Sequence, residues 1–169
     1  MNFKKSTISC AVLVTLGVLS SNALAASDDT LKEDNNPIQT DIMVDAVDNI
    51  IILSQTSTGS VGNEVFLAQE GDFNGVDITI VGDDNVVEAV QIGSDNLALG
   101  SIVGDSNELT LYQEGFANES LTDITGNGNM VEVSQEGDGG PFGFIFNRSI
   151  NTITGDDNEV VIDQGDGGN

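Results

Sequence analysis

The 169-residue sequence lacks histidine and tryptophan, contains a single cysteine and two prolines, and carries only four lysine and arginine residues. Without histidine, a histidine-based catalytic dyad or metal site is excluded. Cys10 is the only cysteine, so no disulfide can form within the chain. Because 28 acidic residues give a formal net charge of −24, binding to nucleic acid through phosphate neutralisation is excluded as well.

Residues 1–25 have the pattern of a secretory signal peptide. Lys4 and Lys5 precede an apolar run over residues 8–19, and Ala23-Leu24-Ala25 is a small-x-small cleavage site. The run is too short to span a bilayer, so we expect no membrane insertion. Cys10 lies inside this segment rather than just after the cleavage site, so a lipoprotein anchor is not indicated.

Removal of this segment makes the chain more acidic. Only Lys32 and Arg148 then oppose 28 carboxylates, a formal charge of 2 − 28 = −26. Residues 26–48 are acidic, polar and unrepeated, and we expect a flexible leader there. The sequence thus predicts three parts: a signal peptide (1–25), this leader (26–48) and a repeat region (49–169).

The repeat region is built from two alternating units. Units of the form Asn-x5-Gln begin at Asn63, Asn85, Asn107, Asn129 and Asn158 and end at Gln69, Gln91, Gln113, Gln135 and Gln164. Units of the form Asn-x5-Ile begin at Asn74, Asn96, Asn118 and Asn147, and one further unit, 49–55, precedes the series. The phase is interrupted once, by an insertion at about 138–146 that contains one proline and three phenylalanines. Such internal repetition indicates a stacked, repetitive fold.

Each unit alternates apolar and polar residues with period two, which predicts a β-strand. Glycine and asparagine tolerate positive φ, so the links between units are predicted to be tight turns. The predicted turn glycines are Gly71, Gly93, Gly115 and Gly137 after the glutamine units, and Gly82, Gly104, Gly126 and Gly155 after the isoleucine units. The expected fold is all-β, a β-solenoid of about five rungs with two parallel sheets and cross-β character.

Stacking explains why amides recur. If each repeat forms one rung, equivalent residues lie about 4.8 Å apart along the stack. The asparagines and glutamines listed above then form ladders in which each side-chain amide bonds to its copies in neighbouring rungs. Asparagine also favours turns, which accounts for the asparagines equally well, but glutamine has no comparable turn chemistry.

This pattern resembles the repeat of curlin, the amyloid subunit of bacterial curli fibres, which runs Ser-x5-Gln-x-Gly-x-x-Asn-x-Ala-x3-Gln. The sequence from Gln91 to Ala98 matches the centre of that repeat. The leading serine of the family is asparagine here, the alanine is kept only at Ala98, and the second glutamine is isoleucine at 80, 102, 124 and 153. The resemblance implies a secreted structural subunit of an extracellular fibre (a pilus or fimbrium) that serves in cell adhesion and biofilm. It also implies a related nucleator subunit and a dedicated outer-membrane secretion system as partners.

The sequence itself favours assembly. No predicted strand contains proline, and the first unit, 49–55, is apolar, β-branched and uncharged, as in self-associating segments. A solenoid without end caps stacks head to tail and grows an open filament. Repulsion between highly acidic copies opposes their encounter, so we expect acid, salt or a divalent cation to speed fibre growth.

Three other readings remain open. The acidic turns, such as 82–85, could bind calcium, although the period of eleven differs from the nine-residue repeat of calcium-binding β-rolls. A soluble secreted solenoid adhesin, with or without calcium, could also remain monomeric. An enzyme is not expected, because every carboxylate recurs with the repeat or lies in a turn; we expect no catalytic residues, cofactor or metal.

The insertion at about 138–146 is either a contact loop for a partner or a cover for the stack.

Overall fold

The computed structural model describes residues 8–14, 24–31, 38–45, 49–57, 62–137 and 147–165, which contain thirteen strands and no helix. Accordingly, this part of the chain holds no helix long and apolar enough to cross a membrane. The strands are β1 (Ile8–Val14), β2 (Leu24–Leu31), β3 (Ile38–Asp45), β4 (Ile50–Ser57), β5 (Glu64–Glu70), β6 (Gly75–Val81), β7 (Val86–Ser94), β8 (Leu97–Val103), β9 (Glu108–Phe116), β10 (Glu119–Thr125), β11 (Met130–Gly137), β12 (Arg148–Thr154) and β13 (Glu159–Gly165).

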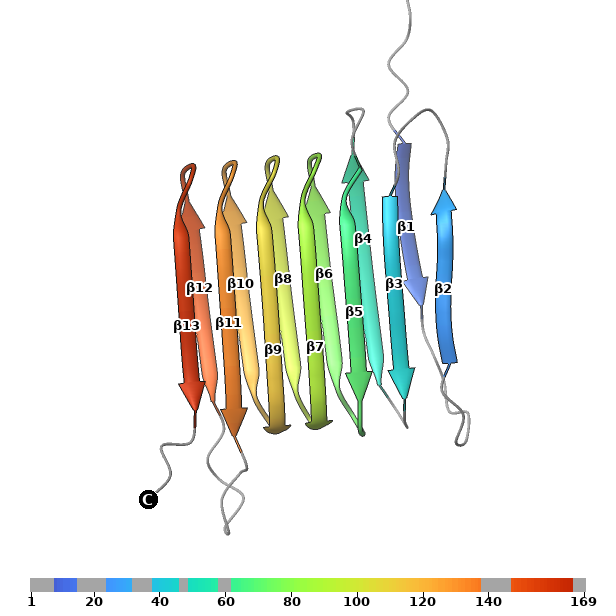
Figure 1. Cartoon of the computed structure of the whole chain (residues 1–169), viewed down its shortest axis with the longest axis vertical. Helices are drawn as coiled ribbons and strands as arrows, with labels where there is room; N and C mark the ends of the chain where they lie inside the picture. The colour runs from blue at the N-terminus through green and yellow to red at the C-terminus, as the bar shows by residue number, and fades with distance from the viewer. Residues whose placement is uncertain are drawn as a thin grey trace, which may run out of the picture.

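Consecutive strands from β4 onward alternate between two sheets that lie face to face (Figure 1). Sheet A has the order β1-β4-β6-β8-β10-β12, and sheet B has the order β13-β11-β9-β7-β5-β3-β2. Each strand from β4 to β13 pairs in parallel with the strand two positions away in sequence. The chain therefore winds as a β-solenoid, with four complete turns between β4 and β12, and the predicted fold class is confirmed.

The register brings equivalent repeat positions above one another. In sheet B, Gln91 pairs with Gln113 and Leu109 pairs with Val131, while in sheet A Ile102 pairs with Ile124. The insertion at 138–146 does not change this register, because β10 pairs with β12 and β11 with β13 at the same repeat positions. A strict side-chain period of two fixes the register, since a slip of one residue would turn the apolar side chains outward.

The sheets extend further toward the N-terminus than the predicted repeat region. β3 pairs in parallel with β5, and β2 pairs with β3 in the antiparallel direction. β1, which lies in the predicted signal peptide, pairs antiparallel with β4. β2 and β3 thus lie where the flexible leader was expected, while the division of the chain into signal peptide, leader and repeat region stays a prediction. The unit 49–55 belongs to sheet A, where Gln55 is in register with Ile80.

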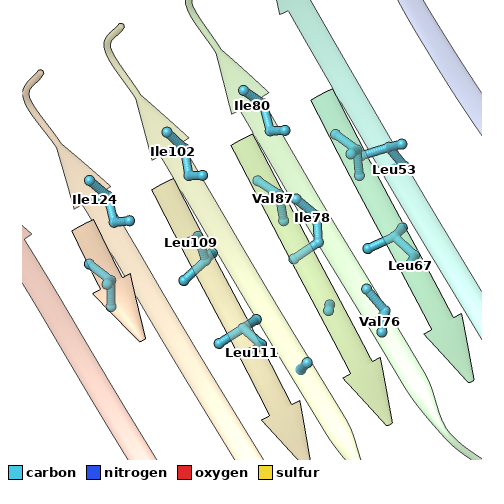
Figure 2. Close-up of a cluster of buried hydrophobic side chains, with 14 of the residues drawn as sticks. Leu53, Leu67, Val76, Ile78, Ile80, Val87, Ile102, Leu109, Leu111 and Ile124 are labelled. Atoms are coloured by element: carbon cyan, nitrogen blue, oxygen red, sulfur yellow. The ribbon is translucent and has the colours of Figure 1, made fainter. Parts of the chain in front are cut away.

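A narrow core separates the sheets (Figure 2). From β4 to β12, the inward positions of each strand are buried and alternate with exposed or half-buried outward positions. Sheet B contributes two branched or small apolar side chains per strand, such as Leu109 and Leu111, and sheet A faces them with residues that include Ala98 and Gly100. Large residues opposite small ones close a thin core without voids.

Candidate functional site: stacked amide ladders and turns

Asparagines, all buried except the half-buried Asn147 and Asn158, line both edges of the solenoid. One column contains Asn49, Asn74, Asn96, Asn118 and Asn147, and the other contains Asn63, Asn85, Asn107, Asn129 and Asn158. Asn107 illustrates the geometry: its Nδ2 donates to Asn85 Oδ1 at 3.0 Å, and its backbone N–H donates to the same oxygen at 2.9 Å. Each step thus joins two successive rungs through the side-chain amide.

The same asparagines also hold the turn of the following rung. Asn107 Nδ2 donates to the carbonyl of Gly126 at 2.9 Å, and Asn85 Nδ2 donates to Gly104 O at 2.9 Å. Asn107 is about 1% exposed, so these groups cannot turn to water. Because a buried amide without partners is destabilising, one asparagine that contacts three successive rungs fixes both their spacing and their register.

The glutamines form a third column inside sheet B. Gln91 Nε2 donates to Gln113 Oε1 at 2.8 Å, and Gln113 Nε2 donates to Gln135 Oε1 at 2.8 Å. The column runs from Gln69 to Gln164 with the same 2.8 Å distance at every step. Each Nε2 also donates to a backbone carbonyl of sheet A, for example Gln113 to Leu97 O at 3.0 Å. Besides linking rungs, glutamine therefore ties the two sheets together.

The turn glycines are required by the backbone and by the stacking distance. Gly104 has a φ of +137°, and a Cβ built there would lie 1.9 Å from Gly126 O in the next rung. The second left-handed residue of each turn is not the asparagine, as the sequence led us to expect, but the residue before it, as at Asp84 with a φ of 58°. The asparagine side chain forms the ladder hydrogen bonds, and the residue before it adopts the left-handed φ.

Gly137 differs from the other predicted turn glycines. It lies at the end of β11 and does not have a left-handed φ. The insertion follows it in sequence, so the three-residue link seen at Gly71, Gly93 and Gly115 is not repeated there. Residues 138–146 lie outside the described residues. Asn147 resumes the ladder by donating to Asn118 Oδ1 at 3.1 Å.

The acidic turns contain a fourth column. The repeat spacing predicts that Asp83 and Asp105 are neighbours in the stack, but it did not reveal the hydrogen bonds that join them. The backbone N–H of Asp83 donates to Asp105 Oδ1 at 2.9 Å, Asp105 N–H donates to Asn127 Oδ1 at 2.8 Å, and Asn127 N–H donates to Asp156 Oδ1 at 2.7 Å. The signal was present in the sequence, because each of these residues follows a turn glycine directly. When a carboxylate accepts a backbone hydrogen bond from the neighbouring rung, that bond partly offsets the repulsion between neighbouring carboxylates.

A buried polar cluster replaces apolar side chains at the C-terminal end of sheet A. Asn151 Nδ2 donates to Thr122 Oγ1 at 3.1 Å, and Ser149 Oγ donates to Asn151 Oδ1 at 3.0 Å. Ser120 is buried beside them, and its hydroxyl has no hydrogen-bond partner. The period-two pattern marks positions 122 and 151 as inward, but their polarity alone did not reveal this network.

A comparison with known protein families matches one part of the chain. Residues 104–137, which include β9, β10 and β11, match the family model described as curlin associated repeat. We find no match among curated proteins or solved structures. The matched segment contains the stacked Asn107, Gln113, Asn118 and Asn129, which is the pattern that the curlin resemblance rested on, and that family is structural rather than enzymatic. The chain therefore contains a segment that matches the curlin associated repeat.

Proposed function

We propose that the processed chain is a secreted structural subunit of curli-like extracellular amyloid fibres, formed by head-to-tail stacking of rungs and serving cell adhesion and biofilm matrix. The open C-terminal end carries this proposal. β12 and β13 end their sheets in the part of the chain that the structure describes, so one row of backbone donors and acceptors on each has no strand beside it. Such edges recruit further strands.

The side chains at this end are those of an interior rung. Val131 and Val133 of β11 are each 1% exposed, whereas Val160 and Ile162 of β13 are only partly buried at the same repeat positions. Another rung stacked on β13 would bury them as β11 is buried. Because burial of apolar area is the main driving force for association, binding of a further rung at the C-terminal end is favourable.

Fibre formation by the processed chain, residues 26–169, is the direct test. We expect thioflavin-positive fibres in negative-stain electron microscopy after incubation, and faster growth in acid or added salt because the −26 charge slows encounter. A chain that stays monomeric under all these conditions would instead be a soluble solenoid adhesin. Thermal stabilisation by calcium at constant ionic strength would support the calcium-bound form of that adhesin.

A substitution within the glutamine column tests the mechanism of stacking. Gln113→Glu removes the donor to Gln135 Oε1 and to Leu97 O and places a charge against amide oxygens in a buried position. We expect this variant to lose fibre formation. The matched control is Glu114→Gln, which changes an exposed neighbour and should still form fibres. Unaltered fibre growth in Gln113→Glu would contradict a role for the ladder.

Export and nucleation are further proposals that rest on the curlin family. We propose a dedicated outer-membrane secretion system and a related nucleator subunit as partners. Deleting the candidate secretion genes in the producing cell should keep the chain off the cell surface, and fibres that still appear on such cells would contradict this route.

A further inference from the structure

The two ends of the solenoid differ. At the C-terminal end β12 and β13 are edge strands, whereas at the N-terminal end β4 and β5 are both covered by strands of the same chain. β1 covers β4, and the predicted processing after residue 25 removes it. β3 covers β5 and remains after processing, together with most of β2. Sheet B therefore keeps an internal cover at the end where another copy would have to stack (Figure 1).

β3 occupies the place of a rung but lacks the residues that make a rung. It runs parallel to β5 in continuous register from Gln39 with Glu64 to Asp45 with Glu70. The position opposite Gln69 is Val44, whose side chain has no amide group. β3 thus completes the backbone hydrogen bonds of sheet B and interrupts the glutamine column.

The interruption leaves a buried acceptor without a donor. Gln69 is 2% exposed, and its Oε1 has no hydrogen-bond partner. The Oε1 atoms of Gln91, Gln113, Gln135 and Gln164 each accept from the Nε2 of the preceding glutamine at 2.8 Å. Gln69 Oε1 therefore lacks the donor that a preceding ladder rung would supply.

The complementary donor lies at the other end of the molecule. Gln164 Nε2 donates to Arg148 O at 3.2 Å, whereas the Nε2 of Gln135 donates both to a carbonyl of sheet A and to the next glutamine. The donor direction is the same along the whole column, from Nε2 of one rung to Oε1 of the next. Gln164 of one copy would therefore meet Gln69 of a second copy with the polarity that the column already has.

We propose that β3 is a replaceable cover, and that β13 of a second copy displaces it from β5 during assembly. This inference rests on the proposed function and adds the junction to it. The junction places Gln164 of one copy against Gln69 of the next and, by the same register, Asp163 against Ala68. The incoming strand satisfies the acceptor that β3 leaves unpaired, and the cover keeps a single copy from presenting a ladder edge at both ends.

A disulfide that locks the cover tests this displacement. Met43 is in register with Ala68, and neighbouring strands lie about 4.8 Å apart, within the Cα separations of about 4.4–6.8 Å that disulfides span. The processed chain has no cysteine, so Met43→Cys/Ala68→Cys carries one pair. We expect the oxidised form to grow fibres at least about tenfold more slowly and reduction to restore growth. Equal rates in the oxidised and reduced forms would overturn the proposal.

A second pair tests the junction itself. In Ala68→Cys/Asp163→Cys, oxidation of finished fibres should join successive copies into a series of covalent multimers on a non-reducing gel. The single variants Ala68→Cys and Asp163→Cys should give dimers at most. Fibres that yield no multimers above a dimer from the double variant would overturn the junction. If the unsubstituted processed chain forms no fibres at all, the proposed function fails instead.

Strengthening the cover without a covalent bond should also delay fibre growth. Val44→Gln supplies a donor opposite Gln69 Oε1, so we expect a longer lag before fibre growth. Val44→Met has a side chain of similar length without a donor and should leave the lag unchanged. Equal lags in Val44→Gln and Val44→Met would contradict a role for the unpaired acceptor.

Discussion

The two sheets of the solenoid share one register but differ in what they bury. In sheet B every strand from β5 to β13 places two apolar side chains and one glutamine inward. In sheet A the inward side chains change along the stack, from Ile51 and Leu53 in β4 to Ser149 and Asn151 in β12. The amide ladders are thus compatible with an apolar core and with a polar one.

The outward faces differ as well. From β5 to β13, sheet B carries nine acidic residues on its outer face: Glu64, Glu70, Glu88, Glu108, Glu114, Glu132, Glu136, Glu159 and Asp163. Sheet A has three there, Asp77, Glu119 and Asp123, and exposes Ile50, Val81, Leu97, Val103 and Ile150. Among the described residues the only ion pair, between Arg148 Nε and Glu119 Oε2 at 3.2 Å, is also on sheet A. Repulsion between copies therefore comes mainly from sheet B.

The comparison shows that backbone pairing and amide columns set the fold, while the remaining inward positions set stability. Because the inward residues differ between rungs, substitutions can measure the contribution of each inward position to stability separately. The following measurements use equilibrium urea unfolding of freshly prepared processed chain before it assembles, followed by circular dichroism, except where a different readout is named.

The largest difference should appear between the two inner faces. Leu111→Ala in sheet B empties a fully buried apolar position and should lower the free energy of unfolding by about 2–5 kcal/mol. Thr122→Ala in sheet A removes the acceptor of Asn151 Nδ2 and should cost about 1–3 kcal/mol. A Thr122→Ala cost above that of Leu111→Ala would reverse the comparison.

Crowding across the core should give a smaller loss. A Cβ at Gly100 would lie 2.7 Å from Ile78 Cδ1 and 3.2 Å from Leu109 Cδ2. Gly100→Ala should therefore destabilise by about 1–3 kcal/mol through overpacking. Gly75→Ala, on the outer side of the same sheet and near only the end of Leu97, serves as the control and should be neutral or stabilising. Equal effects at both glycines would argue against a tightly closed core.

Removal of the buried hydroxyl at Ser120 should stabilise the chain. Its Oγ is buried without a hydrogen-bond partner, so Ser120→Ala removes an uncompensated polar atom. We expect the free energy of unfolding to rise by up to about 1 kcal/mol. A loss of stability in this variant would mean that the hydroxyl belongs to the Thr122–Asn151 network.

The outer face of sheet B provides the smallest and most local test. Tyr112 is the only tyrosine, and its hydroxyl donates to Glu114 Oε2 at 2.6 Å. This hydrogen bond, with burial and the charges of Glu114 and Glu136, raises the pKa of Tyr112 from 10.0 to about 12. The folded state holds the proton more tightly, so the contribution to stability is present below pH 10.0 and is lost as the pH rises through about 12.

Ultraviolet absorbance of tyrosinate measures this midpoint directly, without interference from tryptophan or a second tyrosine. Glu114→Gln should bring the pKa of Tyr112 back toward 10.0, because it removes the charged acceptor. Glu88→Gln, elsewhere on the same face, is the control. An unchanged midpoint in Glu114→Gln would show that the hydrogen bond is not formed in solution.

Much of the site could be read from residue spacing. The positions of Asn107, Gln113 and Gly104 follow from the repeat, and in a parallel stack any recurring position becomes a column. The role of the aspartates in the turns could not be read in the same way. Whether Asp105 faces solvent or accepts from the Asp83 N–H depends on the path of the turn backbone, which spacing does not define.

The sequence by itself determined the solenoid, because a period-two pattern repeated at 22-residue intervals permits one face and one register. Only the tertiary structure decided how the stack ends. Ile38–Asp45 has no repeat signature, yet it pairs with β5, because an open sheet edge binds any extended segment that supplies backbone donors and acceptors. Backbone pairing is independent of side chains, so a strand without amides covers the edge and leaves Gln69 Oε1 unpaired.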